Sequence, residues 1–139
     1  MTQAARVDWR ELKQVVREHF GFRRLRPGQE RAVRAAMQGR DTIVIMPTGS
    51  GKSLCFQLPA LALEGTTIVV SPLIALMKDQ TDSLNKRGIA AISVNSTLSA
   101  RERRVIGEAI ASGCMEFVYT TPERLADPEF RDLLKTLTI

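Results

Sequence analysis

The stretch between residues 42 and 63 constrains the fold of this chain more than any other part of its sequence. A short β-branched run, Thr42 to Met46, leads into a glycine-rich turn, and a helical pattern from about Lys52 to Leu63 leads out of it. β-branched runs of this length are typical of strands that are buried on both faces of a parallel sheet. The succession of strand, turn and helix therefore predicts an α/β fold.

The turn has the composition of a phosphate-binding loop. Gly49 and Gly51 can adopt backbone angles that direct N–H groups at an anion, and the following helix presents its positive end there. Lys52, the predicted catalytic residue, can reach the β- and γ-phosphates, and the Ser53 hydroxyl can bind Mg²⁺. Met46 stands where the strict pattern has glycine. The predicted nucleotide ligands are Thr48, Gly49, Ser50, Gly51, Lys52 and Ser53. The flanking strand and helix favour this interpretation over a plain turn with a solvated lysine.

The rest of the chain alternates between helix and strand patterns. Two helices precede the first strand: one begins at an Asp8–Glu11 capping-box pattern, and the other has Pro27 in its first turn. Strand–helix alternation predicts right-handed βαβ units and a parallel sheet flanked by helices. We expect residues 1–40 to form the N-terminal helices and residues 41–139 to form the sheet. The three further predicted strands span residues 67–71, 90–94 and 116–120.

Four later sites predict helix starts. Ser99 and Glu102 form a second capping-box pattern, and a proline follows a residue with a capping side chain at three other places. These three places are Ser71-Pro72, Thr121-Pro122 and Asp127-Pro128.

Composition and charge narrow the class of protein. With 139 residues, 44% of them hydrophobic, the chain is long enough for one domain with a core. No apolar run approaches the roughly 20 residues of a membrane span, so no membrane partner is expected. Two cysteines are too few for a disulfide scaffold, which predicts a cytoplasmic chain with reduced thiols. The net charge of +5 favours a polyanionic partner without proving one.

Several segments, in this order and spacing, resemble the RecQ family of superfamily 2 DNA helicases. The resemblance covers nearly the whole chain, and it is far more specific than a phosphate loop alone. The segments are Phe20 to Phe22, Leu25 to Gln29, Met46 to Ala60, Val70 to Gln80, Asn95 to Thr97 and Tyr119 to Leu125.

The resemblance implies the first, RecA-like motor domain of an ATP-driven helicase that unwinds DNA from 3′ to 5′ in repair and recombination. The fold would be an incomplete P-loop NTPase sheet, with ATP and Mg²⁺ as cofactors. Gln29 would hydrogen-bond the adenine edge, with Arg26 beside it and Phe22 stacking near the base. An amide side chain can donate and accept at once, which suits adenine.

The resemblance also implies contacts with single-stranded or partly duplex DNA. The segments that begin at Ser71 and Thr121 follow predicted strands, at the ligand-binding edge of an open parallel sheet. Helix N-termini and hydroxyls there suit a DNA backbone, although the same residues can serve simply as helix caps. The predicted DNA ligands are Ser71, Pro72, Lys78, Gln80, Thr121, Pro122, Glu123 and Arg124.

Two parts of a complete helicase have no counterpart in the sequence. In the family, an Asp-Glu-Ala-His motif follows on a further strand, and a second RecA-like domain completes the site with an arginine. Without them we expect the chain alone to be a very poor ATPase, because an arginine finger contributes about 10³–10⁵ in rate. A non-catalytic module that binds ATP or DNA remains an alternative, and a DEAD-box-type RNA helicase is a weaker one.

Other candidate sites carry less weight. His19 is the sole histidine and is expected to pack rather than bind a ligand, and two distant cysteines support no zinc site. The expected location is cytoplasmic and associated with the nucleoid, or nuclear in a eukaryote.

Overall fold

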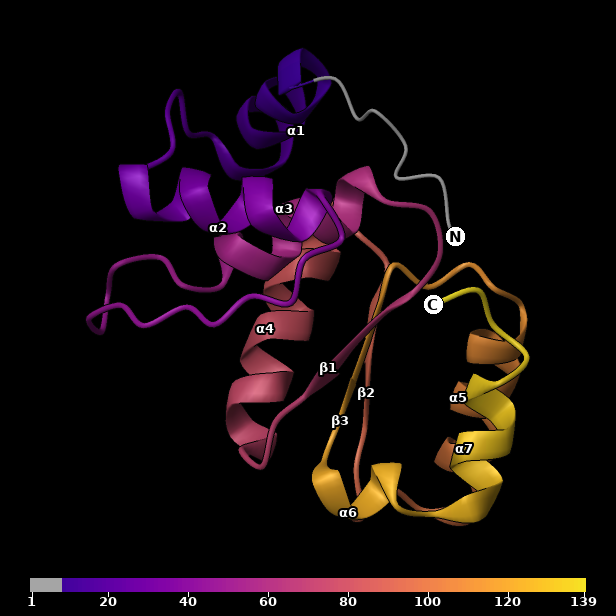
Figure 1. Ribbon diagram of the computed structural model, residues 1–139. Helices are drawn as coiled ribbons and strands as arrows, with labels where there is room; N and C mark the ends of the chain where they lie inside the picture. The colour runs from indigo at the N-terminus through magenta and orange to yellow at the C-terminus, as the bar shows by residue number, and fades with distance from the viewer. Residues whose placement is uncertain (1–8) are drawn as a thin grey trace. The chain divides into compact units, whose positions relative to one another are not determined.

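The computed structural model describes residues 9–139, apart from the side chain of Glu11, so the predicted Asp8–Glu11 capping box lies outside the described residues. The chain forms two compact units, residues 1–63 and 64–139 (Figure 1). The predicted domain ranges, 1–40 and 41–139, stay a prediction, and the division into compact units falls after the glycine-rich turn and its helix. The reason is that the turn is hydrogen-bonded to the second helix through Gln29, as described below.

The first unit is helical. Its described elements are α1 (Trp9–Phe20), α2 (Pro27–Met37) and α3 (Leu54–Ala62). Pro27 is the first residue of α2, as predicted, and Gly21 and Gly39 follow the first two helices with φ angles of +71° and +69°. These left-handed conformations end a helix at little steric cost only when the residue is glycine. The buried side chains of this unit include Leu12, Val16, Val33 and Leu58.

The predicted strand over Thr42 to Met46 is wrong. The segment forms no strand, and Ile43 and Ile45 are 91% and 92% exposed. β-branched residues favour an extended backbone, but a strand exists only where a neighbouring strand supplies hydrogen-bond partners. None of the strands among residues 9–139 pairs with this segment.

The second unit contains a parallel three-stranded sheet with the order β1-β3-β2, rather than the predicted four strands. The strands are β1 (Thr67–Val70), β2 (Ala91–Val94) and β3 (Phe117–Thr120), each within one residue of its predicted bounds. Crossover helices join them, which confirms the α/β class. The helices are α4 (Ile74–Lys86), α5 (Ala100–Ala111), α6 (Pro122–Leu125) and α7 (Pro128–Leu134).

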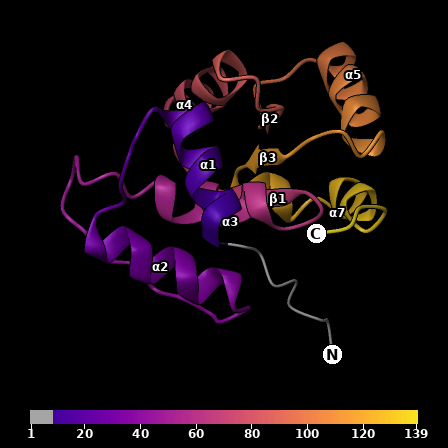
Figure 2. The same cartoon turned by 90° about the horizontal axis from the view of Figure 1, so that it is seen from above.

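The central strand β3 is buried along its whole length, and its side chains alternate between two faces. Val118 belongs to a core cluster with Ile110 of α5 and Phe130 of α7. On the alternate positions, Tyr119 donates a hydrogen bond of 2.9 Å to Gln80 of α4. Helix α4 therefore covers one face of the sheet and helices α5 and α7 cover the other, as Figure 2 shows from above.

Local capping signals account for three of the four predicted helix starts in this unit. The side chain of Ser99 accepts from the Glu102 N–H, and the Glu102 carboxylate accepts from the Ser99 N–H at 2.8 Å. The side chains of Thr121 and Asp127 accept from the N–H groups of Arg124 and Phe130, and so cap α6 and α7 without a reciprocal bond. Ser71-Pro72 is the exception: α4 begins at Ile74, because the Ser71 hydroxyl accepts from the Leu73 N–H and forms a local turn instead.

Candidate nucleotide site and sheet-edge motifs

The glycine-rich loop of the first unit has the backbone geometry of an anion-binding turn. Gly49 and Gly51 have φ angles of +75° and +80° on either side of Ser50. Within the described part of the chain, the N–H groups of Gly49, Gly51 and Lys52 donate to no protein acceptor. Donors that alternate in this way before a helix form a cradle for a negative charge.

The Lys52 ammonium lies over the beginning of the loop. It donates to the Met46 carbonyl at 3.2 Å and to the Pro47 carbonyl at 3.1 Å. The Ser50 hydroxyl also donates to the Pro47 carbonyl. The side chain of Lys52 is exposed, and its only partners here are neutral carbonyl oxygens, so a phosphate could replace them at little cost.

Gln29 ties α2 to the loop, which sequence reasoning did not predict. Its Oε1 accepts from the Arg26 N–H at 2.9 Å, and its Nε2 donates to the Ser50 and Gly51 carbonyls at 3.2 and 3.1 Å. The residue is 4% exposed. Both amide hydrogens are therefore already used within the protein.

The second glycine of the loop cannot be replaced by a larger residue without a clash. A Cβ atom added at Gly51 would lie 2.4 Å from the Gln29 Nε2, whereas one at Gly49 would meet nothing within 4 Å. The close approach of Gln29 thus requires glycine at residue 51. Together with the free N–H groups, this geometry suits the phosphates of a nucleotide.

The other predicted adenine ligands, Phe22 and Arg26, precede α2 in the chain. Phe22 is 50% exposed, and Arg26 is exposed at the N-cap of the helix. An aromatic face open to solvent is able to stack on a base. Cys55, just inside α3, is buried, and burial raises the pKa of its thiol, so it stays protonated and is no nucleophile.

The two segments predicted to contact DNA meet at one edge of the sheet in the second unit. Ser71 follows β1 and Thr121 follows β3, and these strands are parallel neighbours with Val70 opposite Thr120. The Ser71 N–H donates to the Thr120 carbonyl at 2.9 Å, so the two segments begin side by side. The exposed residues of the first segment include Pro72 and Lys78, and those of the second are Pro122 and Glu123.

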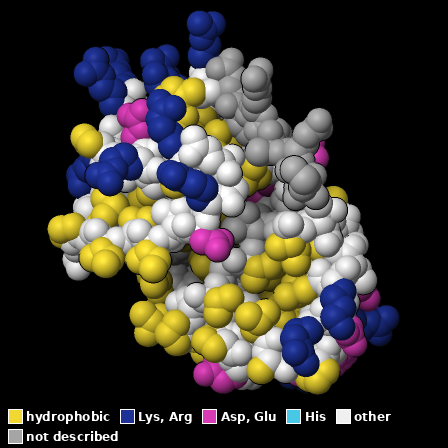
Figure 3. Space-filling view, in the orientation of Figure 1, with side chains coloured by type: hydrophobic (Ala, Val, Ile, Leu, Met, Phe, Trp, Pro, Cys, Tyr) yellow, Lys and Arg dark blue, Asp and Glu magenta, His cyan; other side chains and the backbone are white. Residues whose placement is uncertain are grey.

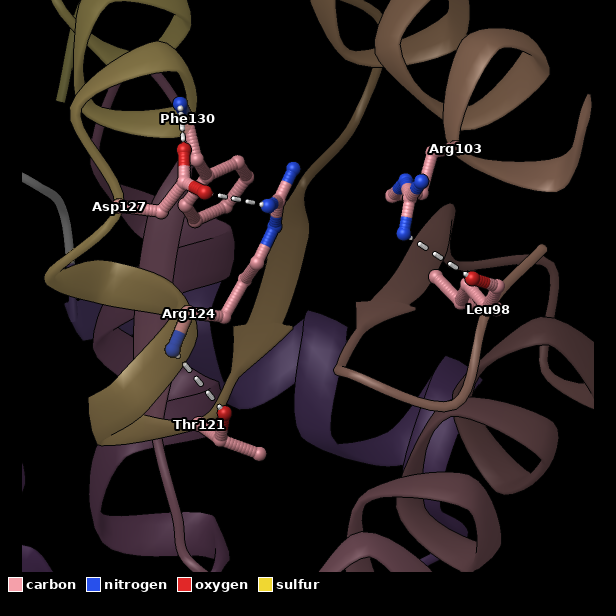
Figure 4. A network of polar contacts seen from close by, with 6 residues as sticks. All are labelled: Leu98, Arg103, Thr121, Arg124, Asp127 and Phe130. Carbon is pink, nitrogen blue, oxygen red and sulfur yellow. Dashed lines mark hydrogen bonds and ion pairs between the residues drawn. The ribbon is translucent and has the colours of Figure 1, made fainter. Parts of the chain in front are cut away.

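Four of the predicted DNA ligands use their side chains within the protein. The hydroxyls of Ser71 and Thr121 accept from local N–H groups, and Gln80 and Arg124 bind other side chains. Gln80 accepts from Tyr119, as described above. Arg124 turns inward: its guanidinium forms an ion pair with Asp127 at 2.9 Å and lies 5.3 Å from the centre of the Phe130 ring. Figure 4 shows this arrangement, with the Arg124 N–H donating to the Thr121 hydroxyl at 3.2 Å. Gln80 and Arg124 therefore stabilise the sheet edge.

Metal and membrane sites are not found in the part of the chain that the structure describes. No group of three or more His, Cys, Asp or Glu side chains could hold a metal ion among those residues. Of the described helices, none has the length and apolar character needed to cross a bilayer.

The chain belongs to the DEAD/DEAH box helicase family, whose model matches residues 26–139. The chain is also similar to the ATP-dependent DNA helicase RecQ of Bacillus subtilis, with 47% identity over 122 residues, and to that of Haemophilus influenzae, with 42% over 120 residues. These alignments cover 87% and 86% of the chain and confirm the resemblance predicted from the motifs.

A solved structure supports the fold. The DUF1998 helicase MrfA, bound to DNA and AMPPNP, aligns with 97% of this chain at a TM-score of 0.72 and 23% identity. The chain spans about a fifth of the length of the RecQ relatives it matches (21% and 19%) and 19% of the MrfA chain.

Proposed function

We propose that this chain forms the nucleotide-binding part of the first motor domain of a RecQ-type, ATP-dependent DNA helicase, which unwinds DNA from 3′ to 5′ in repair and recombination. The observation that carries the proposal is the loop from Thr48 to Ser53, with positive φ angles at Gly49 and Gly51 and unused N–H donors before α3. The family supplies the helicase class, and the similarity to RecQ proteins favours DNA as the substrate.

In this proposal, Lys52 holds the β- and γ-phosphates. Its ammonium leaves the Met46 and Pro47 carbonyls for the phosphate oxygens, because a hydrogen bond between two opposite charges is stronger than one from the ammonium to a neutral carbonyl. The N–H groups of Gly49 and Gly51 add two donors to the same anion. The Ser53 hydroxyl is the proposed ligand of Mg²⁺, which when bound neutralises charge that develops on the phosphates.

Adenine recognition is assigned to the start of α2. Phe22 offers an exposed aromatic face and Arg26 an exposed guanidinium. Gln29 must exchange at least one of its two carbonyl partners, on Ser50 and Gly51, before it can donate to a base. Base binding by Gln29 and loop conformation would then be linked in this protein.

DNA is assigned to the sheet edge where β1 and β3 end. Ser71 and Thr121 begin there side by side, and Lys78 adds an exposed positive charge on α4. Contacts of this kind bind the sugar–phosphate backbone without reading base sequence. The proposed second RecA-like domain would complete the motor, and the proposed location is cytoplasmic and nucleoid-associated, or nuclear in a eukaryote.

The 139-residue chain by itself is proposed to bind ATP and to hydrolyse it very slowly. Its sequence contains no Asp-Glu-Ala-His motif, and a phosphate loop alone positions the nucleotide without activating water. A binding module without turnover is therefore the second candidate function. ATP hydrolysis by the chain at a rate typical of helicases would exclude that candidate.

Nucleotide binding to the Lys52→Ala variant tests the proposal. Fluorescence titration with a ribose-labelled ATP analogue and Mg²⁺ should give saturable binding to the unchanged chain and none to the variant. Lys86→Ala removes the same charge from the last turn of α4 and should leave the affinity unchanged. Equal affinity of the Lys52→Ala and unchanged chains would reject the loop as the nucleotide site.

A further inference from the structure

A second group of positive charges in the first unit lies away from the glycine-rich loop. A cavity of about 410 Å³ opens between α1, the connection over residues 21–26 and the start of α2. Its basic lining comes from Lys13 and Arg17 on α1 and from Arg23 and Arg24 on the connection. In Figure 3, dark blue Lys and Arg side chains gather over this unit in the upper left of the view.

Ion pairs among the described residues do not balance the charge of this basic pocket. Among the residues that the structure describes, its four basic side chains make no ion pair. Glu30 is the acidic residue in its lining, and its carboxylate is bound by Arg34 of the same helix at 2.8 Å. A cavity lined by charges of one sign focuses the electrostatic field and attracts anions from solution.

The floor of the pocket is apolar and includes an aromatic side chain. Leu12 and Val16 are buried beneath it, at 1% and 3% exposure, and hold α1 in place. Trp9 lines the same cavity, and the Arg34 guanidinium lies 3.9 Å from the centre of its ring. The cation–π contact holds the Trp9 ring beside a positive charge. The fluorescence of Trp9 should therefore respond to a ligand that alters the neighbouring charges.

We propose that this pocket binds phosphates of the DNA backbone, as an anchor separate from the sheet edge. Four unpaired cations around one cavity fit successive phosphates of a strand better than a single small anion, and arginine binds phosphate oxygens in a planar fork. The pocket reads no bases, since backbone contacts alone do not specify sequence. The proposal rests on DNA being the substrate under the proposed function.

The test uses the 139-residue chain and an oligothymidylate. Trp9 is the sole tryptophan, so its intrinsic fluorescence reports on this pocket. Titration at about 0.1 M salt should change the fluorescence in a saturable way. Arg23→Gln combined with Arg24→Gln should weaken binding on the order of tenfold and lower the slope of log affinity against log salt by about 1.4, which is two phosphates at about 0.7 each.

A charge-matched variant separates a site from overall charge. Arg31→Gln combined with Arg40→Gln removes two exposed arginines from the same unit outside this pocket. This control should retain the affinity within twofold and leave the salt slope unchanged. Equal losses in the two double variants would overturn the proposal, because any two positive charges would then serve.

Two further outcomes locate a failure. DNA binding detected by anisotropy of a labelled strand, without a Trp9 response and unchanged in the Arg23/Arg24 variant, would overturn the pocket while leaving the proposed function intact. No DNA binding by the unchanged chain would overturn both. A Trp9 response to ATP in the Lys52→Ala variant would assign the pocket to free phosphate compounds instead of DNA.

Discussion

Two runs of residues that favour strands have opposite outcomes in the two units of this chain. Residues 117–120 form β3, with Phe117 and Val118 fully buried between strands on both sides. Thr42 to Met46 also consists mainly of residues that favour strands, yet it forms no strand, and Ile43 and Ile45 are more than 90% exposed. The difference lies in the neighbours: β3 has two parallel partners, and the other run has none among the described strands. Residue types can favour an extended backbone, but a strand forms only where neighbouring strands supply hydrogen-bond partners.

Truncating one side chain in each run should give the largest contrast. Phe117→Ala removes a fully buried ring and should lower the free energy of unfolding by about 3–5 kcal/mol. Ile45→Ala removes an exposed side chain and should change it by less than about 0.5 kcal/mol. Urea denaturation followed by circular dichroism measures both. A comparable loss for Ile45→Ala would mean that this segment is packed in solution.

Removing the hydrogen bonds between Gln29 and the loop should lower the free energy of unfolding by an intermediate amount, in the first unit only. Gln29→Ala leaves the Ser50 and Gly51 carbonyls without their donor, which should cost about 1–3 kcal/mol. It should also weaken the preference for ATP over GTP in a competition titration. Gln38→Ala, at the exposed C-cap of α2, is the matched control and should change neither quantity. An unaltered competition ratio for Gln29→Ala would remove its role at adenine.

Removing the N-cap side chain of a helix should change stability by a smaller amount, and the change should differ between the two units. The Ser99 hydroxyl caps α5, so Ser99→Ala should lower stability by about 1 kcal/mol. Arg26 stands at the N-cap of α2 without a capping side-chain bond, and Arg26→Ala should lower stability by less than about 0.5 kcal/mol. Thermal melts of both variants measure this, and a larger loss for Arg26→Ala would contradict the assigned caps.

The smallest expected effect is a pH dependence at the same cap. Hydrogen bonds from Ser99 hold the pKa of the Glu102 carboxyl below its ordinary value near 4.5. A depressed carboxyl pKa stabilises the fold above the ordinary value, and this contribution disappears as the pH falls through the lowered value. Glu102→Gln keeps an acceptor but cannot titrate. Chemical denaturation between about pH 6 and pH 3 should therefore show a slightly weaker acid dependence in the variant, and identical profiles would contradict the assignment.

Sequence alone could predict what short-range chemistry determines. The Ser99–Glu102 capping box, Pro27 at the start of α2 and the two glycines of the loop each act within a few residues, and each lies where it was expected. The bonds of Gln29 to the loop join residues 21 and 22 positions apart, and no local pattern encodes them. The predicted strand over Thr42 to Met46 was wrong for the same reason, because a strand depends on pairing with segments that are distant in the sequence.

The inward turn of Arg124 also had a signal that could have been used. Asp127 follows it by three residues, a spacing that allows an ion pair within a helical turn. The guanidinium lies against Phe130 and Asp127 and so links α6 to α7. The DNA contact that the motif resemblance implies for Arg124 stays a prediction.

Hydrogen–deuterium exchange of the 139-residue chain, with and without ATP and Mg²⁺, tests the central claim most directly. The claim is that the loop of the first unit is the nucleotide-binding site, while the sheet of the second unit is ordered without ATP. We expect ATP to slow exchange at the amides of residues 49–53 and to leave the protected amides of β3 unchanged. Protection by ATP that appears only in residues 64–139, or no change at residues 49–53 under saturating ATP, would contradict the account.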